Sequence, residues 1–365
     1  MRLLTENRFK IHPTKYPMLF LVGGCTVFNS FWAGVQKLTH GKKIAAQELS
    51  SPPIFVIGHW RSGTTLMHEI LTQDKRLAFP STYDCFLPHH FLVSRWFFHP
   101  VVKLLMPAHR PMDNMPAGVD LPQEDEFALC TMGSPTPYRR VAFCNNQPRH
   151  QDLLNTSSAN PQHVEQLKNS LTHFCRALTL RYQKPLVLKS PTHTGRIAQL
   201  AEWFPGARFI HISRHPYRIF SSTIRLWKAL DQVQSYQKPS YSEDWLRQFV
   251  FQSYEKMYQG YFDAADTIKD NRLIEIRYED LMEDSLGTIG RIYSQLELPA
   301  FEETSSSVAQ FLESRGNYKP NQLKTDPELI SEINQRWSRY FERYGYDKQE
   351  SSMENQADHP APSST

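Results

Sequence analysis

One stretch near the start of the chain carries residue types that bind oxyanions. Within residues 54–67, an apolar run stops at Gly58 and the apolar spacing of a helix begins after Gly63. Small residues at such a turn let backbone N–H groups approach an anion, and the positive end of the helix dipole points at the same place. The side chains that add hydrogen-bond donors are Arg61, Ser62, Thr64 and Thr65. The pattern predicts a phosphate cradle.

The two glycines have the spacing of the Walker loop, G-x(4)-G. That loop requires a lysine directly after the second glycine, where it reaches the outer phosphates of a nucleoside triphosphate. Thr64 holds this position, and the cation lies earlier, at Arg61. A magnesium-dependent nucleoside triphosphate enzyme is therefore disfavoured. A P-loop nucleotide kinase remains one alternative, and an unrelated turn of similar composition is another.

Two further cations follow predicted strands. Residues 186–189 form a short apolar strand that ends at Lys189, and residues 208–213 form a second strand that leads into Arg214. A helical pattern follows each strand, and this alternation predicts a parallel sheet. Ligands of such sheets bind at the carboxyl ends of the strands. We therefore expect both cations on the same rim as Arg61.

Carboxylates gather at the start of another predicted helix, as Glu124, Asp125 and Glu126. Acids there could simply interact favourably with the helix dipole. One of them could instead be a general base that removes a proton from a hydroxyl group. Both interpretations stay open, and for the base we favour Glu124 or Glu126, with Asp84 and His59 as reserves.

The composition is that of a globular protein and limits the classes of partner. The 41 Lys and Arg residues barely exceed the 37 Asp and Glu residues, and they are scattered, so a nucleic-acid partner is not indicated. The five cysteines are widely spaced without a C-x-x-C pair. We interpret them as free thiols in a reducing compartment, and we expect neither a disulfide framework nor a metal site.

An apolar segment lies close to the N-terminus. Residues 17–35 contain no formally charged side chain and could just span a bilayer. A spanning helix is weakened by Asn29, Ser30 and two central glycines. Three alternatives stay open: the helix lies on or anchors in a membrane, it packs on the catalytic domain, or it spans the membrane. We expect the catalytic domain on the cytoplasmic side, associated with the membrane surface through this helix. The aromatic-rich residues 79–106 either cap the core or form an acceptor pocket or lipid-contacting patch.

These patterns predict an α/β protein with a P-loop-type three-layer fold, in which helices flank a central parallel sheet, plus an N-terminal hydrophobic helix. The predicted strands are residues 54–57, 186–189, 208–213 and 272–278. The predicted helices are residues 65–71, 163–182, 197–203, 217–227, 243–268, 279–296 and 329–344. We expect residues 1–50 to form the apolar N-terminal region, residues 51–347 the α/β domain with an insert at about 79–129, and residues 348–365 a disordered tail.

The cradle sequence resembles the 5′-phosphosulfate loop of sulfotransferases, which has the pattern basic-Ser-Gly-Thr-Thr and binds 3′-phosphoadenosine 5′-phosphosulfate (PAPS). Those enzymes hold the 3′-phosphate with a later strand-end arginine and a serine eight residues on, here Arg214 and Ser222 in SRHPYRIFSSTIRLW. The segment LVLKSPTHTGRI supplies Lys189, and IRYEDL supplies Tyr278 near the adenine. The resemblance covers roughly residues 54–298 and is to bacterial-type sulfotransferases, distantly like tyrosylprotein sulfotransferase.

The resemblance implies in-line sulfuryl transfer from PAPS to a hydroxyl acceptor, which could be a carbohydrate, lipid, protein or small molecule. Arg61 and Lys189 would hold the 5′-phosphate and the departing oxygen, a carboxylate would take the acceptor proton, and no metal would be needed. The expected donor-binding residues are Arg61, Ser62, Gly63, Thr64, Thr65, Arg214, Ser222, Tyr278 and Lys319, the last in a basic loop at 314–320. A membrane-associated nucleotide-binding protein without turnover is a further alternative.

Overall fold

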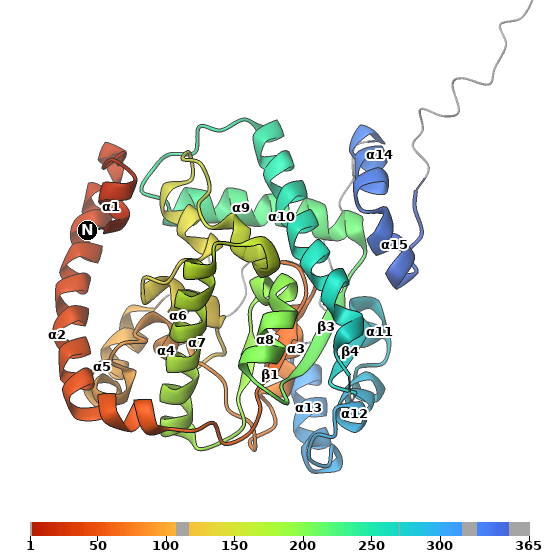
Figure 1. The fold of residues 1–365 in the computed structure, drawn as a ribbon, viewed down its shortest axis with the longest axis horizontal. Helices are drawn as coiled ribbons and strands as arrows, with labels where there is room; N and C mark the ends of the chain where they lie inside the picture. Colours follow the sequence, from red (N-terminus) through yellow and green to blue (C-terminus); the bar gives the residue numbers. More distant parts are fainter. Residues whose placement is uncertain (1, 107–116, 270, 316–326, 350–365) are drawn as a thin grey trace, which may run out of the picture.

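Four short parallel strands form the centre of the computed structural model, which describes residues 2–106, 117–269, 271–315 and 327–349 (Figure 1). The strands are β1 (Ile54–Ile57), β2 (Val187–Lys189), β3 (Arg208–Ser213) and β4 (Leu273–Arg277). They lie in the order β2-β1-β3-β4, and every neighbouring pair is parallel. The predicted strands are therefore confirmed, with ends that differ by at most one residue.

The sheet is covered on both faces, which explains why the central strand β1 is entirely apolar and buried. Phe55 and Phe209 belong to one core, and Val56 and Ile210 belong to the core on the opposite face. The first core includes residues of α7 (Pro161–Tyr182), α8 (Ile197–Trp203), α9 (Pro216–Gln234), α10 (Glu243–Ala264), α14 (Pro327–Arg336) and α15 (Ser338–Tyr344). The second includes residues of α3 (Thr64–Leu71), α11 (Tyr278–Glu283), α12 (Ser285–Gln295) and α13 (Glu302–Ser314). This is the expected arrangement of a central sheet between helices.

Two helices expected to be continuous are each divided in the structure. The predicted helix at 279–296 ends at Glu283, and Asp284 caps the next helix by accepting a hydrogen bond of 2.9 Å from the N–H of Gly287. The predicted helix at 329–344 breaks at the buried Trp337. Short 3-10 turns complete the chain: η1 (Pro13–Lys15), η2 (Pro137–Phe143), η3 (Gln151–Leu154), η4 (Thr156–Ser158), η5 (Pro191–Arg196) and η6 (Ala265–Thr267).

The expected apolar helix near the N-terminus is present and is longer than its uncharged core. After the short α1 (Arg2–Glu6), α2 runs over Tyr16–Ala46 along one side of the domain (Figure 1). It is long and apolar enough to cross a membrane, and none of its most apolar window is buried. Within the insert, the described helices are α4 (Thr82–Phe86), α5 (Phe91–Leu105) and α6 (Asp125–Thr131). The tail from residue 350 onward lies outside the described residues.

Candidate active site

The turn between β1 and α3 has a backbone that requires its two glycines. Gly58 and Gly63 have φ values of 140° and 111°, a region that L side chains rarely adopt. A Cβ atom on Gly58 would lie 2.4 Å from the carbonyl oxygen of Ile212, and one on Gly63 would lie 2.4 Å from Cδ2 of Tyr278. The turn can therefore close only while both positions lack a side chain.

This turn delivers a helix N-terminus to the sheet rim. Gly63 is the N-cap of α3, and among the described residues no side chain caps the first turn of that helix. The first N–H groups of a helix have no partner inside the helix and, together with the dipole, favour an anion. The Ser62 hydroxyl nearby is buried and has no hydrogen-bond partner among the described residues. The geometry is suitable for a phosphate or sulfate group.

The expected 3′-phosphate residues lie beside this turn. Nε of Arg61 donates to Oγ of Ser222 at 2.9 Å, and Nη1 of Arg214 donates to the carbonyl oxygen of Arg61 at 3.1 Å. The Arg214 guanidinium stacks over the Tyr278 ring, 4.1 Å from its centroid. Thus the residues predicted to bind the two phosphates lie in contact with one another on one rim of the sheet. Lys319 lies outside the described residues.

Lys189 and Glu124 meet where the sheet ends. Lys189 is the last residue of β2, paired in register with Val56 of β1. Its Nζ donates to Oε1 of Glu124 at 2.7 Å and to Oγ1 of Thr65 at 3.4 Å. The other carboxylate oxygen of Glu124 accepts a hydrogen bond of 2.5 Å from the hydroxyl of Tyr138. Glu124 therefore connects the cradle to residues of η2.

Glu126, the other favoured candidate for the base, has a different environment from Glu124. It is fully buried, and Arg196 donates to its two oxygens at 2.7 and 3.1 Å. Burial alone would raise the pKa of Glu126, but the charge and hydrogen bonds of Arg196 hold this pKa below its usual range. Thr136 and Thr192 also donate to it. Its carboxylate is occupied inside the protein.

The two reserve candidates for the base also form hydrogen bonds within the protein. Asp84 caps α4 together with Ser81 and accepts a hydrogen bond of 2.7 Å from the hydroxyl of Tyr182. His59 is buried, with Nδ1 at 2.9 Å from the carbonyl oxygen of Trp60, and burial lowers the pKa of its imidazole to about 3. Of the four candidate bases, the described lining of the cavity below includes Glu124 alone.

A cavity of about 210 Å³ joins the cradle to an apolar chamber. One set of lining residues belongs to the cradle and its rim: Arg61, Gly63, Thr64, Thr65, Arg214, Tyr278 and Arg315. Another set is mostly apolar and comes from α6, η2 and α9: Phe127, Tyr138, Val141, Leu226, Trp227 and Leu230. Glu124 also lines the cavity. It accepts hydrogen bonds from Tyr138 of the second set and from Lys189, which in turn contacts Thr65 of the first set, so it lies at the junction of the two sets.

The sequence did not single out Tyr138. Its hydroxyl donates to Glu124 and accepts a hydrogen bond of 2.8 Å from Nε1 of Trp60, while its ring lies 5.2 Å from that of Phe127. Burial and the negative charge of Glu124 raise the pKa of Tyr138 well above its ordinary value, so the phenol keeps the proton that it donates. The only signal in the sequence is a tyrosine within the short segment PTPYRR, which does not indicate a carboxylate partner.

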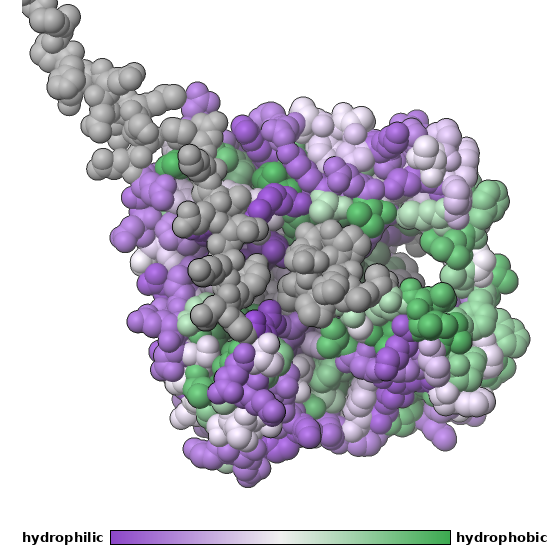
Figure 2. All heavy atoms as spheres, turned by 180° about the vertical axis from the view of Figure 1, so that it is seen from behind, coloured by the Kyte–Doolittle hydropathy of each residue, from purple (hydrophilic) through white to green (hydrophobic). Residues whose placement is uncertain are grey.

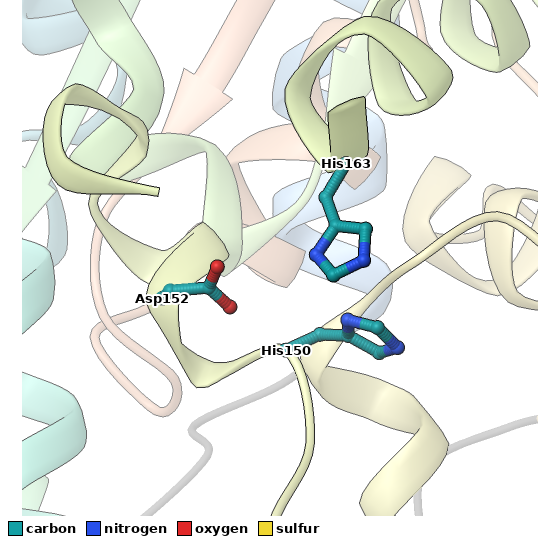
Figure 3. Close-up of side chains that lie close together, drawn as sticks. All are labelled: His150, Asp152 and His163. Atoms are coloured by element: carbon teal, nitrogen blue, oxygen red, sulfur yellow. The ribbon is translucent and has the colours of Figure 1, made fainter. Parts of the chain in front are cut away.

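A cluster of potential metal ligands lies apart from this cavity. Ligand atoms of His150, Asp152 and His163 lie within 4.8 Å of one another, with the side chains arranged as in Figure 3. Arg139 also lies beside this cluster, with Nη1 at 3.4 Å from Nε2 of His150. Burial, with the neighbouring His163 and Arg139, lowers the pKa of His150 to about 4. None of the three is among the residues that line the cavity.

Comparison with known proteins agrees with this geometry. Residues 52–303 match the sequence profile of the sulfotransferase family. The chain is 38% identical over 348 residues to the omega-hydroxy-beta-dihydromenaquinone-9 sulfotransferase Stf3 of Mycobacterium bovis and of Mycobacterium tuberculosis, a match that covers 95% of this chain and 89% of each relative.

Solved structures share the fold. Sulfotransferase STF9 from Mycobacterium avium superposes with a TM-score of 0.67 at 17% identity, covering 87% of this chain and 82% of that one. Sulfotransferase STF1 from Mycobacterium tuberculosis superposes with a TM-score of 0.56 at 16% identity, covering 84% of this chain and 81% of that one. These structures confirm the expected α/β fold. The family profile and the 38% identical relatives favour sulfuryl transfer over a P-loop kinase or a binding protein without turnover. The chain belongs to the sulfotransferase family and is a transferase enzyme.

Proposed function

We propose that this enzyme moves the sulfuryl group of PAPS to the terminal hydroxyl of an apolar lipid acceptor, with Glu124 as the general base. The observation that carries this proposal is the position of Glu124 between the anion cradle and the apolar chamber. A donor nucleotide on the cradle and a hydroxyl entering from the chamber would meet beside this carboxylate.

The donor half of the proposal rests on the cations and the helix N-terminus. The 5′-phosphate would lie on the first turn of α3, with Thr64 and Thr65, and the 3′-phosphate would lie on Arg214 and Ser222. Lys189 would turn from Glu124 toward the oxygen that bridges sulfur and the 5′-phosphate. Fixed cations at the leaving oxygen stabilise the charge that develops there in a loose transition state.

The proposed chemical step involves the acceptor and PAPS alone. The acceptor oxygen forms a bond to sulfur while the bond between sulfur and the bridging oxygen breaks, and the electron pair stays on the 5′-phosphate of adenosine 3′,5′-bisphosphate. The acceptor proton passes to the carboxylate of Glu124, which Lys189 has released. Tyr138 donates to the other oxygen of that carboxylate and so keeps its orientation.

The acceptor class rests on two independent observations. The chamber is lined largely by aromatic and aliphatic side chains from α6, η2 and α9, which suit an apolar substrate with one polar end. The relatives that match 95% of this chain are named for a sulfotransfer to the ω-hydroxyl of a dihydromenaquinone, a molecule of this kind.

A cytoplasmic location fits the state of the cysteines. All five, Cys25, Cys85, Cys130, Cys144 and Cys175, are free thiols in the structure. Free thiols persist in reducing compartments, whereas secreted proteins tend to form disulfides. We therefore place the catalytic domain on the cytoplasmic side.

An acceptor screen tests the proposed function. The full chain would be incubated with sulfur-labelled PAPS and, in parallel, with an ω-hydroxylated prenylquinol, a short soluble prenyl alcohol, a phenol and a sugar. We expect label on the prenylquinol and, more slowly, on the prenyl alcohol. Transfer to the phenol or the sugar alone would overturn the lipid assignment, and transfer from ATP in place of PAPS would overturn the donor.

A further inference from the structure

The exposed side of α2 carries a stripe of large apolar side chains. Phe20, Val27, Phe31 and Leu38 are spaced by seven, four and seven residues, which places them on one face of the helix. They are 76%, 74%, 64% and 89% exposed. The chain has no formally charged residue between Lys15 and Lys37. Such a contiguous exposed apolar surface is unusual for a protein surrounded only by water.

The stripe continues onto α5 through a series of ring contacts. Phe31 contacts Trp32, Trp32 contacts Phe97, and Phe97 contacts Trp96, with centroid distances of 5.3, 4.8 and 5.0 Å. Trp96 at the far end of the series is 83% exposed, and Leu104 on the same helix is 85% exposed. Hydrophobic residues gather along the right edge of Figure 2, the side of the molecule on which α2 lies in the opposite view of Figure 1. The two helices therefore present one apolar face.

Two amide side chains of α2, those of Asn29 and Gln36, form hydrogen bonds on its other side. Nε2 of His90 lies 3.1 Å from Oδ1 of Asn29, and the N–H of Leu92 donates to Oε1 of Gln36 at 2.9 Å. Both bonds connect α2 to the N-terminal end of α5. The amide side chains of α2 thus form their hydrogen bonds within the protein. The apolar stripe on the opposite side is left for another partner.

Both ends of α2 are attached to the same domain. At the start, Nζ of Lys15 donates to the carbonyl oxygen of Gln232 at 2.9 Å. The N–H of His12 donates to the carbonyl oxygen of Tyr236, also at 2.9 Å. Near the end, Ile44 is buried in the main core. A spanning helix would need its ends on opposite sides of a hydrocarbon layer about 30 Å thick. A helix held at both ends by one folded domain cannot cross that layer without loss of these contacts.

Exposed cations lie close to this apolar face. They are Lys37, Lys42 and Lys43 in the last part of α2 and Lys103 in the last part of α5. Cations beside an apolar surface are attracted to anionic lipid headgroups while the apolar side chains enter the boundary between headgroups and acyl chains.

We propose that α2 and α5 together dock this enzyme in the plane of an anionic bilayer surface, without spanning it. This inference rests on the proposed function, since docking matters for catalysis only if the acceptor is a lipid. The docked surface would give that lipid a route to the site. The connection is α9: Leu226, Leu230 and Gln234 line the cavity, and the end of the same helix holds the start of α2. The docking face and the apolar chamber are thus attached to the same element.

Vesicle flotation tests the docking face with the full chain. The vesicles would contain phosphatidylcholine with or without phosphatidylglycerol, and the variants would be Phe31→Glu on α2 and Trp96→Glu on α5. Removing one large apolar contact and adding a charge should lower the bound fraction about tenfold or more in each variant. The matched control is Leu286→Glu on α12, also an exposed apolar residue, and it should float like the parent.

Several outcomes would overturn the inference. A parent protein that stays at the bottom of the gradient with both vesicle types has no docking face. A Trp96→Glu variant that floats like the parent excludes α5, provided that its thermal unfolding matches the parent. Retention in the vesicles after an alkaline carbonate wash would indicate a span instead of in-plane docking.

Flotation also separates this inference from the proposed function, since binding requires no turnover. Protein that floats but transfers no label from PAPS would refute the proposed reaction and leave the docking face standing. Protein that sulfates a soluble prenyl alcohol but does not float would refute the docking face alone. We expect both Glu variants to keep parental activity on the soluble acceptor and to lose it on vesicle-embedded acceptor.

Discussion

Lys189 and Glu124 form an ion pair of 2.7 Å at the junction of the cradle and the apolar chamber. One residue ends β2 and the other precedes α6, 65 residues apart in the chain. In the proposed reaction these two charges act on opposite sides of the transferred group, the cation on the leaving oxygen and the carboxylate on the acceptor hydroxyl. Their pairing keeps both charges compensated until the donor draws the lysine away.

The first prediction concerns the base. Glu124→Gln should lower kcat about a hundredfold or more, because an amide cannot take up the acceptor proton. Binding of adenosine 3′,5′-bisphosphate, measured by calorimetry, should change little. The same substitution at the exposed Glu202 on α8 is the control and should leave kcat unchanged. A Glu124→Gln enzyme with parental kcat would place the base elsewhere.

The second prediction concerns the turn between β1 and α3. Gly63→Ala should weaken donor binding about tenfold or more, because the new Cβ would lie 2.4 Å from Cδ2 of Tyr278 at a φ of 111°. Moving Tyr278 would also disturb Arg214, which stacks on it. Gly133→Ala is the matched control: its φ is also positive, at 78°, but nothing lies within 4 Å of the added carbon. Equal losses of affinity in both variants would contradict the steric explanation.

The third prediction concerns recognition of the 3′-phosphate. Arg214→Met should raise the KM for PAPS about tenfold or more, since a hydrogen bond to a charged group contributes roughly 1.5–3 kcal/mol. The sharper measurement is discrimination between PAPS and adenosine 5′-phosphosulfate, which lacks that phosphate. The variant should treat the two donors more alike than the parent does. Arg225→Met, at an exposed position of α9, the helix that follows Arg214, should keep parental discrimination.

The fourth prediction concerns stability at low pH. Because Arg196 holds the pKa of Glu126 below 4.5, the ionised carboxylate stabilises the fold fully above that value, and this contribution is lost as the pH falls through the lowered pKa. Denaturant unfolding between pH 7 and pH 3 should therefore show a decrease in the free energy of unfolding below about pH 4.5. Glu126→Gln should weaken that pH dependence and lower stability by about 3–5 kcal/mol at pH 7.

A second variant makes this fourth prediction decisive. Replacing both partners, as Glu126→Leu with Arg196→Met, leaves no unpaired buried charge and should recover much of the stability lost by Glu126→Gln. Glu302→Gln at an exposed position of α13 is the control for a lost surface carboxylate. If Glu126→Gln unfolds like the parent at every pH, Glu126 is not part of a stabilising pair.

The sequence by itself determined the sheet and the tight turn that follows β1. A strand followed by closely spaced glycines and hydroxyl residues has few physical outcomes, because only a tight turn with a positive φ can use that pattern. The same holds for the rim: parallel strands end at one edge of the sheet, so Lys189 at the end of β2 and Arg214 directly after β3 lie at the same edge. These conclusions depended on short-range patterns, and the structure agrees with them.

Only the tertiary structure showed that the acids lie in different environments and that the two flanks of α2 differ. Successive residues at a helix start point in different directions, so Glu124 faces the cavity while Glu126 turns toward Arg196, 70 residues farther along the chain. The sequence likewise showed an apolar helix at 17–35 but not that its amide side chains face α5. Each of these outcomes depends on a partner that is distant in the chain and close in space. Local sequence patterns do not predict which distant residues will come into contact.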